Sequence, residues 1–238
     1  MTESEKVIRD DGAVALVHPD YRERVKLDWF SASYWGKSAR QVSSGGRGGA
    51  WFIQAGDLDL VLREYRRGGL AARISQKTYV YTKERAVRSF SEFRLLQKLH
   101  GMDFPVPKPV AALYKKTSLI QYQASIIVER LRDAITLAEV VGSLDTNDWQ
   151  NLGVVIRAFH EANVRHADLN CFNVMVHDGR FYLIDFDRGR IMPENSDPNW
   201  KTANLERFAR SLRKVAGERI QARIWDSFII GYKRSPAA

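Results

Sequence analysis

Two segments in the C-terminal half of the chain constrain its fold and chemistry more than any other feature. The first is His166-Ala167-Asp168-Leu169-Asn170-Cys171-Phe172-Asn173, and the second is Leu183-Ile184-Asp185-Phe186-Asp187. An aspartate is thus followed five positions later by an asparagine, and twelve positions after that by a second aspartate at the end of an apolar, strand-like run. Five residues are enough for a loop to turn back on itself. The spacing therefore predicts that Asp168 and Asn173 point into one cleft, with Asp185 facing it.

This order of residues is typical of the phosphoryl-transfer machinery of kinases. Asp168 is expected to accept the proton of the attacking hydroxyl, while Asn173 and Asp185 are expected to hold a Mg²⁺ ion that bridges the nucleotide phosphates. Because the transition state is loose, hard oxygen ligands beside one carboxylate base are sufficient. We expect His166 to brace the loop through a hydrogen bond and Asp187 to have a structural role. The simpler alternative, a His-Asp turn beside an ordinary strand, does not account for both motifs in this order.

Length and cysteine content limit the class of protein. A chain of 238 residues, 45% of them hydrophobic, fits one large domain or two small lobes around a cleft. No apolar run reaches the ~18 residues of a membrane-spanning helix, and the polar residues 1–11 do not resemble a signal peptide, so we expect the protein in the cytoplasm. Its only cysteine, Cys171, excludes an intramolecular disulfide and a cysteine-based zinc site. We expect Cys171 to be a small packing residue, since no phosphoenzyme step is required.

The formal net charge of +9 is unevenly distributed. Between Arg63 and Arg88 there are eight basic residues and two acidic ones, and a second basic series lies near the C-terminus at largely helical spacing: Arg207, Arg210, Arg213, Lys214, Arg219 and Arg223. Such segments attract nucleic acid, an anionic membrane surface or a phosphorylated substrate. A solvated face without a partner is the alternative, and the charge pattern alone does not separate these possibilities.

A glycine-rich segment stands before the first clear strands. Gly45, Gly46, Gly48 and Gly49 occupy four of five consecutive positions, and residues 51–62 read as two short strands around Gly56-Asp57. Glycines between strands let backbone amides close over phosphates without clashes from Cβ atoms. Since the segment precedes the other kinase-like motifs in the expected order, we predict that these four glycines bind ATP.

Residues 83–99 have helical periodicity that stops at His100-Gly101. Glu92 shares a stripe with Leu96 and Leu99, so its carboxylate should point inward and needs a cationic partner. Kinases supply a lysine from the preceding strand, but the corresponding position here is Arg63, and we predict that Arg63 and Glu92 belong to the ATP site. The alternative is a surface Glu92 with Arg63 as part of the basic segment.

The second half reads as a small, mainly helical unit. Residues 125–128 form a strand-like run into Glu129, where a hinge would offer backbone groups to adenine. Helices are predicted over residues 137–141, 148–163 and 200–215, with a short strand over residues 181–186. These elements predict an α+β, bilobal protein-kinase-like fold, with a small β-rich N-lobe over residues 1–130 and a compact helical C-lobe over residues 131–238.

Only about fifty residues follow Asp187. Protein kinases continue with a long activation segment ending in Ala-Pro-Glu and a large helical platform for peptides, and this chain has neither. Its motif is Asp-Phe-Asp instead of Asp-Phe-Gly, which removes one backbone freedom used in switching. The pattern favours a compact, constitutively formed kinase acting on a non-protein acceptor.

Several phrases of the sequence resemble the lipopolysaccharide core kinases of Gram-negative bacteria. They are Gly45 to Trp51, Val61-Leu62-Arg63-Glu64-Tyr65-Arg66-Arg67-Gly68-Gly69, His166 to Asn173, Ile184 to Gly189, and Trp200 to Leu212. The resemblance covers roughly residues 40–215. The catalytic motif is common to all kinase-like folds, whereas the Arg-Arg-Gly-Gly phrase is much more specific. Length and that phrase look most similar to the branch that phosphorylates 3-deoxy-D-manno-octulosonic acid (Kdo).

The resemblance implies transfer of the γ-phosphoryl group of ATP to the 4-hydroxyl of Kdo on a Kdo-bearing lipid A precursor. It implies work at the cytoplasmic face of the bacterial inner membrane, as a peripheral protein, with Arg63 on the α- and β-phosphates. The acceptor carries a carboxylate and phosphates, so Arg66, Arg67, Arg73 and Lys77 are expected to bind it and the anionic bilayer. No nucleic-acid partner is expected.

Three other readings remain open from the residues. A heptose kinase of the lipopolysaccharide inner core would share every catalytic residue and differ only in acceptor contacts. A small atypical protein kinase would also lack Ala-Pro-Glu, but would be expected to keep the lysine that Arg63 replaces. A catalytically inactive scaffold would account for the missing lysine, although it would not account for intact Asp168, Asn173 and Asp185.

Overall fold

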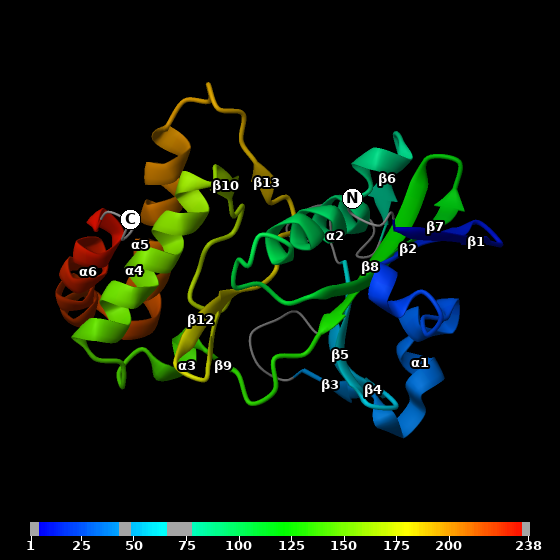
Figure 1. The fold of residues 1–238 in the computed structure, drawn as a ribbon, viewed down its shortest axis with the longest axis horizontal. Helices are drawn as coiled ribbons and strands as arrows, with labels where there is room; N and C mark the ends of the chain where they lie inside the picture. Colours follow the sequence, from blue (N-terminus) through cyan, green and yellow to red (C-terminus); the bar gives the residue numbers. More distant parts are fainter. Residues whose placement is uncertain (1–4, 43–48, 66–77, 235–238) are drawn as a thin grey trace. The chain divides into compact units, whose positions relative to one another are not determined.

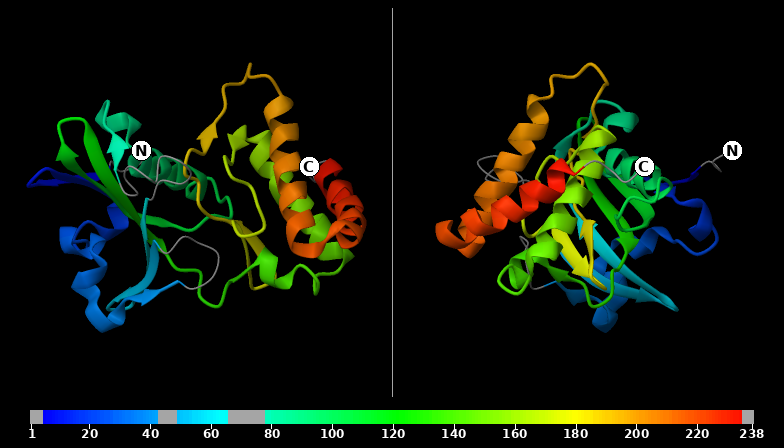
Figure 2. Two further views of the ribbon diagram at one scale, coloured as in Figure 1. Left: turned by 180° about the vertical axis from the view of Figure 1, so that it is seen from behind. Right: turned by 60° about the vertical axis from the view of Figure 1, so that its left-hand side comes forward.

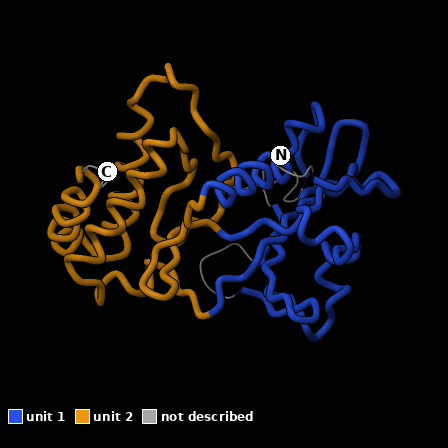
Figure 3. Tube along the Cα trace, in the orientation of Figure 1, with its two compact units in different colours: residues 1–102, 107–132 blue, residues 103–106, 133–238 orange. Residues whose placement is uncertain are grey.

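The structure, a computed structural model, describes residues 5–42, 49–65 and 78–234. Predictions for Gly45, Gly46 and Gly48, and for the basic residues of the 66–77 segment (Arg66, Arg67, Arg73 and Lys77), lie outside the described residues. The chain divides into two compact units (Figure 3). Unit 1 contains residues 1–102 and 107–132, and unit 2 contains residues 103–106 and 133–238. The division falls after Arg132, and the four residues 103–106 group with unit 2.

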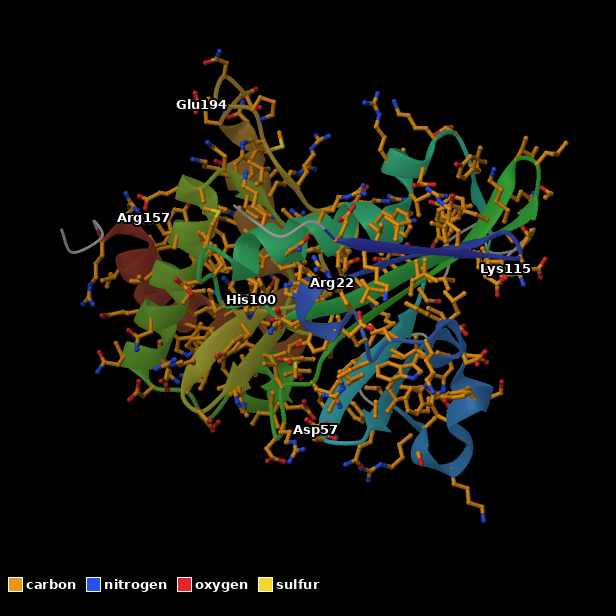
Figure 4. The ribbon with its side chains drawn as sticks, turned by 45° about the vertical axis from the view of Figure 1, so that its right-hand side comes forward. Arg22, Asp57, His100, Lys115, Arg157 and Glu194 are labelled. Carbon is orange, nitrogen blue, oxygen red and sulfur yellow. The ribbon has the colours of Figure 1, made fainter. Side chains whose placement is uncertain are left out.

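Unit 1 is built on an antiparallel sheet (Figure 1). Its strands follow the order β1 (Lys6–Asp10), β2 (Ala13–Val17), β7 (Pro109–Ser118), β8 (Gln121–Glu129), β5 (Leu58–Glu64), β4 (Ala50–Ala55) and β3 (Arg40–Gln41), with β6 (Tyr79–Val80) paired to β8. The predicted pair of strands around Gly56-Asp57 is confirmed as β4 and β5. Gly56 has a φ of +66°, which a glycine adopts without strain, and Asp57 is labelled beside it in Figure 4.

The two faces of this sheet are covered by different segments. Ala111 and Ile127 pack into a buried cluster with Tyr21, Trp29 and Phe30, which belong to residues 18–39. This segment contains the 3-10 turns η1 (Pro19–Tyr21), η2 (Leu27–Phe30) and η3 (Gly36–Ser38) and the short helix α1 (Ala32–Trp35), none of which the sequence patterns predicted. Successive residues of a strand face opposite ways, so the neighbouring residues of β7 and β8 face the other side, where helix α2 (Arg88–His100) packs.

Helix α2 begins five residues later than the periodicity predicts. Residues Glu84–Ala86 form a 3-10 turn, η5, and Val87 is extended. The Glu84 carboxylate is held by Arg9 and by the Tyr114 hydroxyl, which keeps this stretch out of the helix. The first amide of α2, that of Arg88, donates to the Tyr122 hydroxyl at 3.2 Å. The start of the helix is therefore set by residues of β7, β8 and β1 that are remote in sequence.

Unit 2 combines short strands with helices (Figure 2). Strands β12 (Arg180–Leu183), β11 (Val174–His177) and β9 (Ile135–Thr136) form one sheet, and β10 (Val164–Arg165) pairs with β13 (Arg190–Ile191). The helices are α3 (Leu137–Val140), α4 (Thr146–Glu161), α5 (Asn199–Ala216) and α6 (Glu218–Lys233). The predicted helices are confirmed to within two residues, whereas α6 was not predicted. None of the helices in the described parts of the chain is both long and apolar enough to cross a bilayer.

Two predicted ends in unit 2 need correction. Helix α4 begins at Thr146, two residues earlier than predicted, because Asp145 accepts a hydrogen bond from the Asp148 amide and Asp148 reciprocates as a capping box. The strand predicted over residues 181–186 ends at Leu183, since Asp185 adopts a left-handed φ of 61° that breaks the extended run. The early end of β12 affects the site directly, because Asp185 lies in the turn that follows the strand and not in the strand itself.

Helices α4 and α6 touch through their backbones at two glycines. A Cβ atom built on Gly153 would overlap with the backbone of Phe228 and Tyr232, and one on Gly231 would overlap with that of Gln150. Only glycine allows two helices to approach this closely. This contact brings Tyr232 on α6 close enough to reach His160 on α4.

Candidate active site

The loop from residue 166 to residue 173 is braced from within, as predicted for His166. Nδ1 of His166 accepts from the Asp168 amide at 3.2 Å, so Nε2 carries the ring proton and donates it to the Ile184 carbonyl oxygen at 2.9 Å. The ring is buried, and burial lowers the pKa of His166, which keeps it neutral. The neutral imidazole therefore ties the loop to the segment before Asp185.

The structure brings Asp168, Asn173 and Asp185 together within unit 2. The Asn173 side chain donates from Nδ2 to the backbone oxygen of Asp168 at 2.9 Å. Its own backbone oxygen accepts from the Ile184 amide at 3.0 Å, one residue before Asp185. The Asp187 amide donates to Asp185 Oδ1 at 3.4 Å, which helps to hold the left-handed turn. Phe186 between them is buried, with its ring centroid 4.7 Å from that of His166.

The donor set at Asn173 and Asp185 fits Mg²⁺. With Nδ2 of Asn173 engaged by the loop, Oδ1 is the atom it offers to a ligand, and Asp185 adds a carboxylate; both are hard oxygen donors. Among the described residues there is no group of three or more His, Cys, Asp or Glu side chains that could hold a metal. Two protein ligands are what Mg²⁺ needs when substrate phosphates and water complete its octahedron.

Helix α5 holds the catalytic loop with three side chains on one face. Asn204 Nδ2 donates to the His166 carbonyl oxygen at 2.7 Å, and Ser211 Oγ accepts from the Cys171 amide at 3.0 Å. Between them Arg207 donates from Nε to Asp168 Oδ1 at 2.7 Å, and its Nη2 reaches the same oxygen. Their spacing of three and four residues places them on one helix face. Cys171 itself is buried, which confirms its expected packing role, and burial raises the pKa of its thiol.

The sequence pattern placed Arg207 in the basic series near the C-terminus and indicated no role for Asn204. A polar stripe at 204, 207 and 211 on an otherwise amphipathic helix is the signal that could have identified them. Its partner could not be read from the sequence, because the loop that it contacts lies 39 residues away from Arg207.

A buried chain of hydrogen bonds connects helix α5 to helices α4 and α6. Asn204 donates to the loop, so its Oδ1 accepts from His160 Nε2 at 3.1 Å, which leaves His160 Nδ1 to accept from the Tyr232 hydroxyl at 2.8 Å. Burial lowers the pKa of His160 to about 4, so the ring is neutral at pH 7. This chain of hydrogen bonds connects α6 to α4, α4 to α5, and α5 to the loop of residues 166–173.

In unit 1, Arg63 and Glu92 form the ion pair that the helical stripe predicted. Arg63 Nη2 lies 2.5 Å from both carboxylate oxygens of Glu92, whose side chain is only 2% exposed. The Tyr65 hydroxyl also donates to Glu92, and the Arg63 guanidinium lies 4.7 Å from the Tyr65 ring centroid. Arg63 and Tyr65 therefore both bind one buried carboxylate, and the alternative of a surface Glu92 is excluded.

Gly49 lies close to this pair. Its carbonyl oxygen accepts from the Glu64 amide at 2.7 Å, and the next residue, Ala50, pairs with Arg63 across β4 and β5. The last glycine of the Gly-rich segment thus lies next to the residue that pairs with Arg63.

Glu129 ends strand β8, and its side chain is already engaged. The Tyr21 hydroxyl donates to the Glu129 carboxylate at 2.5 Å, and burial together with this bond raises the pKa of Tyr21. The Glu129 amide donates to the Lys108 carbonyl oxygen and the Arg130 amide to that of Asp59, both at 2.9 Å. The side chain and the amide of Glu129 are therefore both engaged within unit 1.

Solved structures share this fold. A structure of WaaP in complex with acyl carrier protein matches 93% of this chain and 89% of its own, with a TM-score of 0.59 and 15% identity. The amicoumacin kinase hAmiN, in complex with AMP-PNP, Ca²⁺ and Ami, matches 91% of this chain and 80% of its own, with a TM-score of 0.61 and 11% identity. At these identities the likeness establishes the fold alone, and it confirms the predicted α+β protein-kinase-like class.

Sequence relatives are much closer. A protein of Stenotrophomonas maltophilia (strain R551-3) named 3-deoxy-D-manno-octulosonic acid kinase is 44% identical over 206 residues, which are 83% of this chain and 80% of that protein. One of the same name from Xylella fastidiosa (strain M12) is 39% identical over 208 residues, covering 86% and 82%. The family model described as lipopolysaccharide kinase (Kdo/WaaP) family matches residues 32–232. The kinase-like loop, the Arg63–Glu92 pair and these matches lead to one conclusion: the chain belongs to the lipopolysaccharide kinase (Kdo/WaaP) family.

Proposed function

We propose that this chain transfers the γ-phosphoryl group of ATP to the 4-hydroxyl of Kdo in a Kdo-bearing lipid A precursor. The family match and the relatives named Kdo kinase support this assignment. The site supports it independently, since Asp168, Asn173 and Asp185 stand in the order and proximity that phosphoryl transfer requires.

Asp168 orients the acceptor hydroxyl and takes its proton. The Nε and Nη2 donors of Arg207 both bind Oδ1, which leaves Oδ2 for the acceptor hydroxyl. Asn173 Oδ1 and the Asp185 carboxylate would hold Mg²⁺, which would supply neutralisation of the nucleotide phosphate charge. The loop is fixed by His166 and by helix α5, so Asp168 needs little reorganisation before reaction.

Residues of unit 1 bind the nucleotide in this proposal. Arg63, oriented by Glu92 and Tyr65, binds the α- and β-phosphates. Gly45, Gly46, Gly48 and Gly49 cover the phosphates with backbone amides, and Glu129 offers its carbonyl oxygen to adenine. An arginine here neutralises phosphate as a lysine does, with a planar fork in place of a point charge.

The observation that favours an acidic sugar over a neutral heptose is Arg207 beside Asp168. A guanidinium has five N–H donors, and Asp168 takes one from Nε and one from Nη2. Arg207 and Asp168 are both about half exposed, at 48% and 50% of their side chains, so the remaining donors face solvent where an acceptor arrives. A sugar carboxylate bound there would carry its hydroxyl to Asp168. Kdo has this carboxylate, and a heptose lacks it.

A substrate–variant cycle tests this assignment. Wild-type protein and Arg207→Ala are each assayed with ATP and Mg²⁺ on a soluble Kdo glycoside and on its methyl ester, which keeps the hydroxyl and loses the charge. Addition of one phosphate to the acid is measured by mass spectrometry, and kcat/KM is measured for all four combinations. Arg207→Lys, which keeps the charge without the fork, is the matched control.

The expected result is strong coupling between the two changes. Esterification should lower kcat/KM of the wild-type protein about 10- to 100-fold, the value of a lost charge-assisted hydrogen bond of about 1.5–3 kcal/mol, and should have little effect on Arg207→Ala. Equal losses for both proteins would mean that Arg207 acts on Asp168 or on the γ-phosphate instead. If the wild-type protein phosphorylates a heptose acceptor and leaves Kdo unmodified, the Kdo assignment is wrong.

The location of the acceptor completes the proposal. A lipid A precursor is embedded in a bilayer, so we place the protein at the cytoplasmic face of the bacterial inner membrane as a peripheral protein. Arg66, Arg67, Arg73 and Lys77 are proposed to bind the anionic acceptor or lipid, each contributing about 1 kcal/mol near a charged surface. Phosphorylation of intact Kdo-lipid A in vesicles, compared between wild-type protein and a variant with alanine at these four positions, tests this role.

A further inference from the structure

Three large apolar side chains at the tip of the β7–β8 hairpin and on the neighbouring strand β6 are exposed. Leu119 is 93% exposed, Ile120 is 64% exposed and Val80 is 63% exposed. The Tyr81 amide donates to the Ile120 carbonyl oxygen at 2.8 Å, and Val80 pairs with Gln121, so β6 lies beside the tip of the β7–β8 hairpin (Figure 1). We call Val80, Leu119 and Ile120 the hairpin patch.

The fold itself does not require apolar residues at the tip. Ser118 pairs with Gln121, so Leu119 and Ile120 are the two residues of a two-residue hairpin loop. Such loops favour glycine, asparagine and aspartate, because these residues adopt the backbone angles of tight turns most easily. A leucine and an isoleucine at these positions do not stabilise the turn, and they expose apolar surface to water. Their presence points to a contact beyond the residues that the structure describes.

The patch stands on a rigid aromatic base. The ring centroids of Tyr79 and Tyr122 lie 5.7 Å apart, as do those of Tyr81 and Tyr114, and Phe90 of α2 lies 5.2 Å from Tyr114. Packed rings hold the strands at fixed positions under the tip. Little conformational order has to be gained when the patch binds.

Basic residues surround the patch. Lys115 and Lys116 precede the tip on β7, and Lys115 is labelled on this hairpin in Figure 4. The Lys116 ammonium lies 4.1 Å from the Tyr81 ring centroid. Two carboxylates of this region are paired, Asp11 with Lys115 and Glu84 with Arg9. Lys83, Arg85 and Lys116 have no carboxylate partner among the residues that the structure describes, which leaves a positive rim.

We propose that the hairpin patch inserts into the surface of an anionic bilayer, with Lys83, Arg85 and Lys116 on the lipid headgroups. Three side chains on a projecting tip are too few for a stable protein interface, which buries about 800 Å² on each partner. Shallow apolar insertion combined with basic residues is how peripheral proteins bind anionic lipid. The inference rests on the proposed function only in that a lipid-embedded acceptor gives this contact a use.

Vesicle binding tests the proposal. Full-length wild-type protein and Leu119→Glu/Ile120→Glu are mixed with vesicles of phosphatidylethanolamine containing phosphatidylglycerol, and with vesicles of phosphatidylcholine alone, and the bound fraction is measured by sedimentation. The matched control is Ile220→Glu/Ile230→Glu on α6, which makes the same change of charge at side chains 41% and 51% exposed. We expect binding to the anionic vesicles to fall at least about tenfold in the hairpin variant and much less in the control.

A second measurement reports insertion directly. The only native cysteine, Cys171, is buried, so a cysteine introduced as Leu119→Cys can be labelled selectively with an environment-sensitive fluorophore. Emission should shift to shorter wavelength on anionic vesicles and remain unchanged on phosphatidylcholine. The same label at Ile230→Cys should not shift.

The outcomes separate this inference from the proposed activity. Phosphorylation of a soluble Kdo glycoside by the hairpin variant should equal that of the wild-type protein, whereas phosphorylation of Kdo-lipid A in vesicles should fall with binding. Equal vesicle binding by the hairpin variant and the control would overturn the inference, as would an unshifted label, even if the soluble glycoside is phosphorylated. A wild-type protein that binds vesicles through the patch but phosphorylates neither acceptor would overturn the proposed function and leave the membrane contact standing.

Discussion

Arg207 on helix α5 donates two hydrogen bonds to a single carboxylate oxygen of Asp168, 39 residues earlier in the chain. The direction of the catalytic carboxylate is therefore set by a helix and not by its own loop. Asn204 and Ser211 bind the same loop from the same helix face. In the proposed mechanism the two oxygens of Asp168 have different tasks: Arg207 holds Oδ1, and Oδ2 binds the acceptor hydroxyl.

Replacing Asp168 with asparagine should abolish turnover without unfolding the protein. The side chain is half exposed and its loop is held by His166 and Asn204, so the fold does not depend on its charge. General-base catalysis is typically worth about 10²–10⁴-fold, and we expect a loss of at least this size in kcat. Single-turnover phosphate transfer and the circular dichroism melting curve are the measurements. An Asp168→Asn protein with near-normal kcat would remove Asp168 from the mechanism.

Breaking the Arg63–Glu92 pair should cost stability as well as activity. Arg63→Ala leaves the buried Glu92 carboxylate with fewer partners, and loss of one member of a buried pair typically costs about 3–5 kcal/mol. Arg63→Lys retains the charge and should recover much of the stability. Denaturant unfolding and nucleotide affinity are measured for both variants. If Arg63→Ala binds ATP as tightly as the wild-type protein, the assignment of Arg63 to the phosphates is wrong, whatever its effect on unfolding.

Metal and nucleotide should stabilise the protein together. Asn173 and Asp185 offer two oxygen ligands, too few to hold Mg²⁺ tightly without phosphate oxygens. We therefore expect ATP with Mg²⁺ to raise Tm, by an amount that grows with ligand concentration above Kd, and expect Mg²⁺ alone to have little effect. Asp185→Asn should reduce the joint effect. A full Tm increase with ATP and chelator, or an unchanged increase in Asp185→Asn, would contradict this metal site.

Acid should destabilise unit 2 through His160. Its folded pKa of about 4 lies below the ordinary value of 6.5, so the unfolded chain binds a proton more readily, and stability is complete above pH 6.5 and is lost as the pH falls toward 4. The free energy of unfolding should fall by about 2 kcal/mol from this residue between pH 7 and pH 5. His166, with its pKa also lowered by burial, acts in the same direction. Chemical denaturation of His160→Gln between pH 7 and pH 5 should show a smaller fall in the free energy of unfolding than the wild-type protein shows. An equal fall would mean that His160 is not responsible.

Alanine at Gly153 or Gly231 should separate helices α4 and α6. The added methyl group meets backbone atoms of the other helix and not flexible side chains, so the helices must move apart. Overpacking of this kind typically costs about 1–3 kcal/mol. Gly142→Ala, where a Cβ meets no atom within 4 Å, is the matched control. Chemical denaturation of the three variants measures the difference, and equal stability of Gly153→Ala and Gly142→Ala would mean that the helices are not in backbone contact.

The sequence by itself determined the features that depend on local pattern. The catalytic loop, the β4–β5 hairpin around Gly56 and most helices follow from short-range spacing and turn residues, which act over one or two turns of chain. Even the inward direction of Glu92 followed from its place on a helical stripe. Chemistry was also local: an aspartate, an asparagine and an aspartate at fixed intervals indicated phosphoryl transfer.

Only the tertiary structure decided which distant groups meet. Tyr122 caps α2, Arg207 binds Asp168, and Gly231 on the unpredicted helix α6 packs against Gln150. No periodicity specifies such pairs, because a side chain on an exposed-looking helix face has the same pattern whether it meets solvent or a catalytic carboxylate. The choice is made by packing: once the buried faces of α4, α5 and α6 are joined, the polar stripe of α5 has one place to lie, against the loop that carries Asp168.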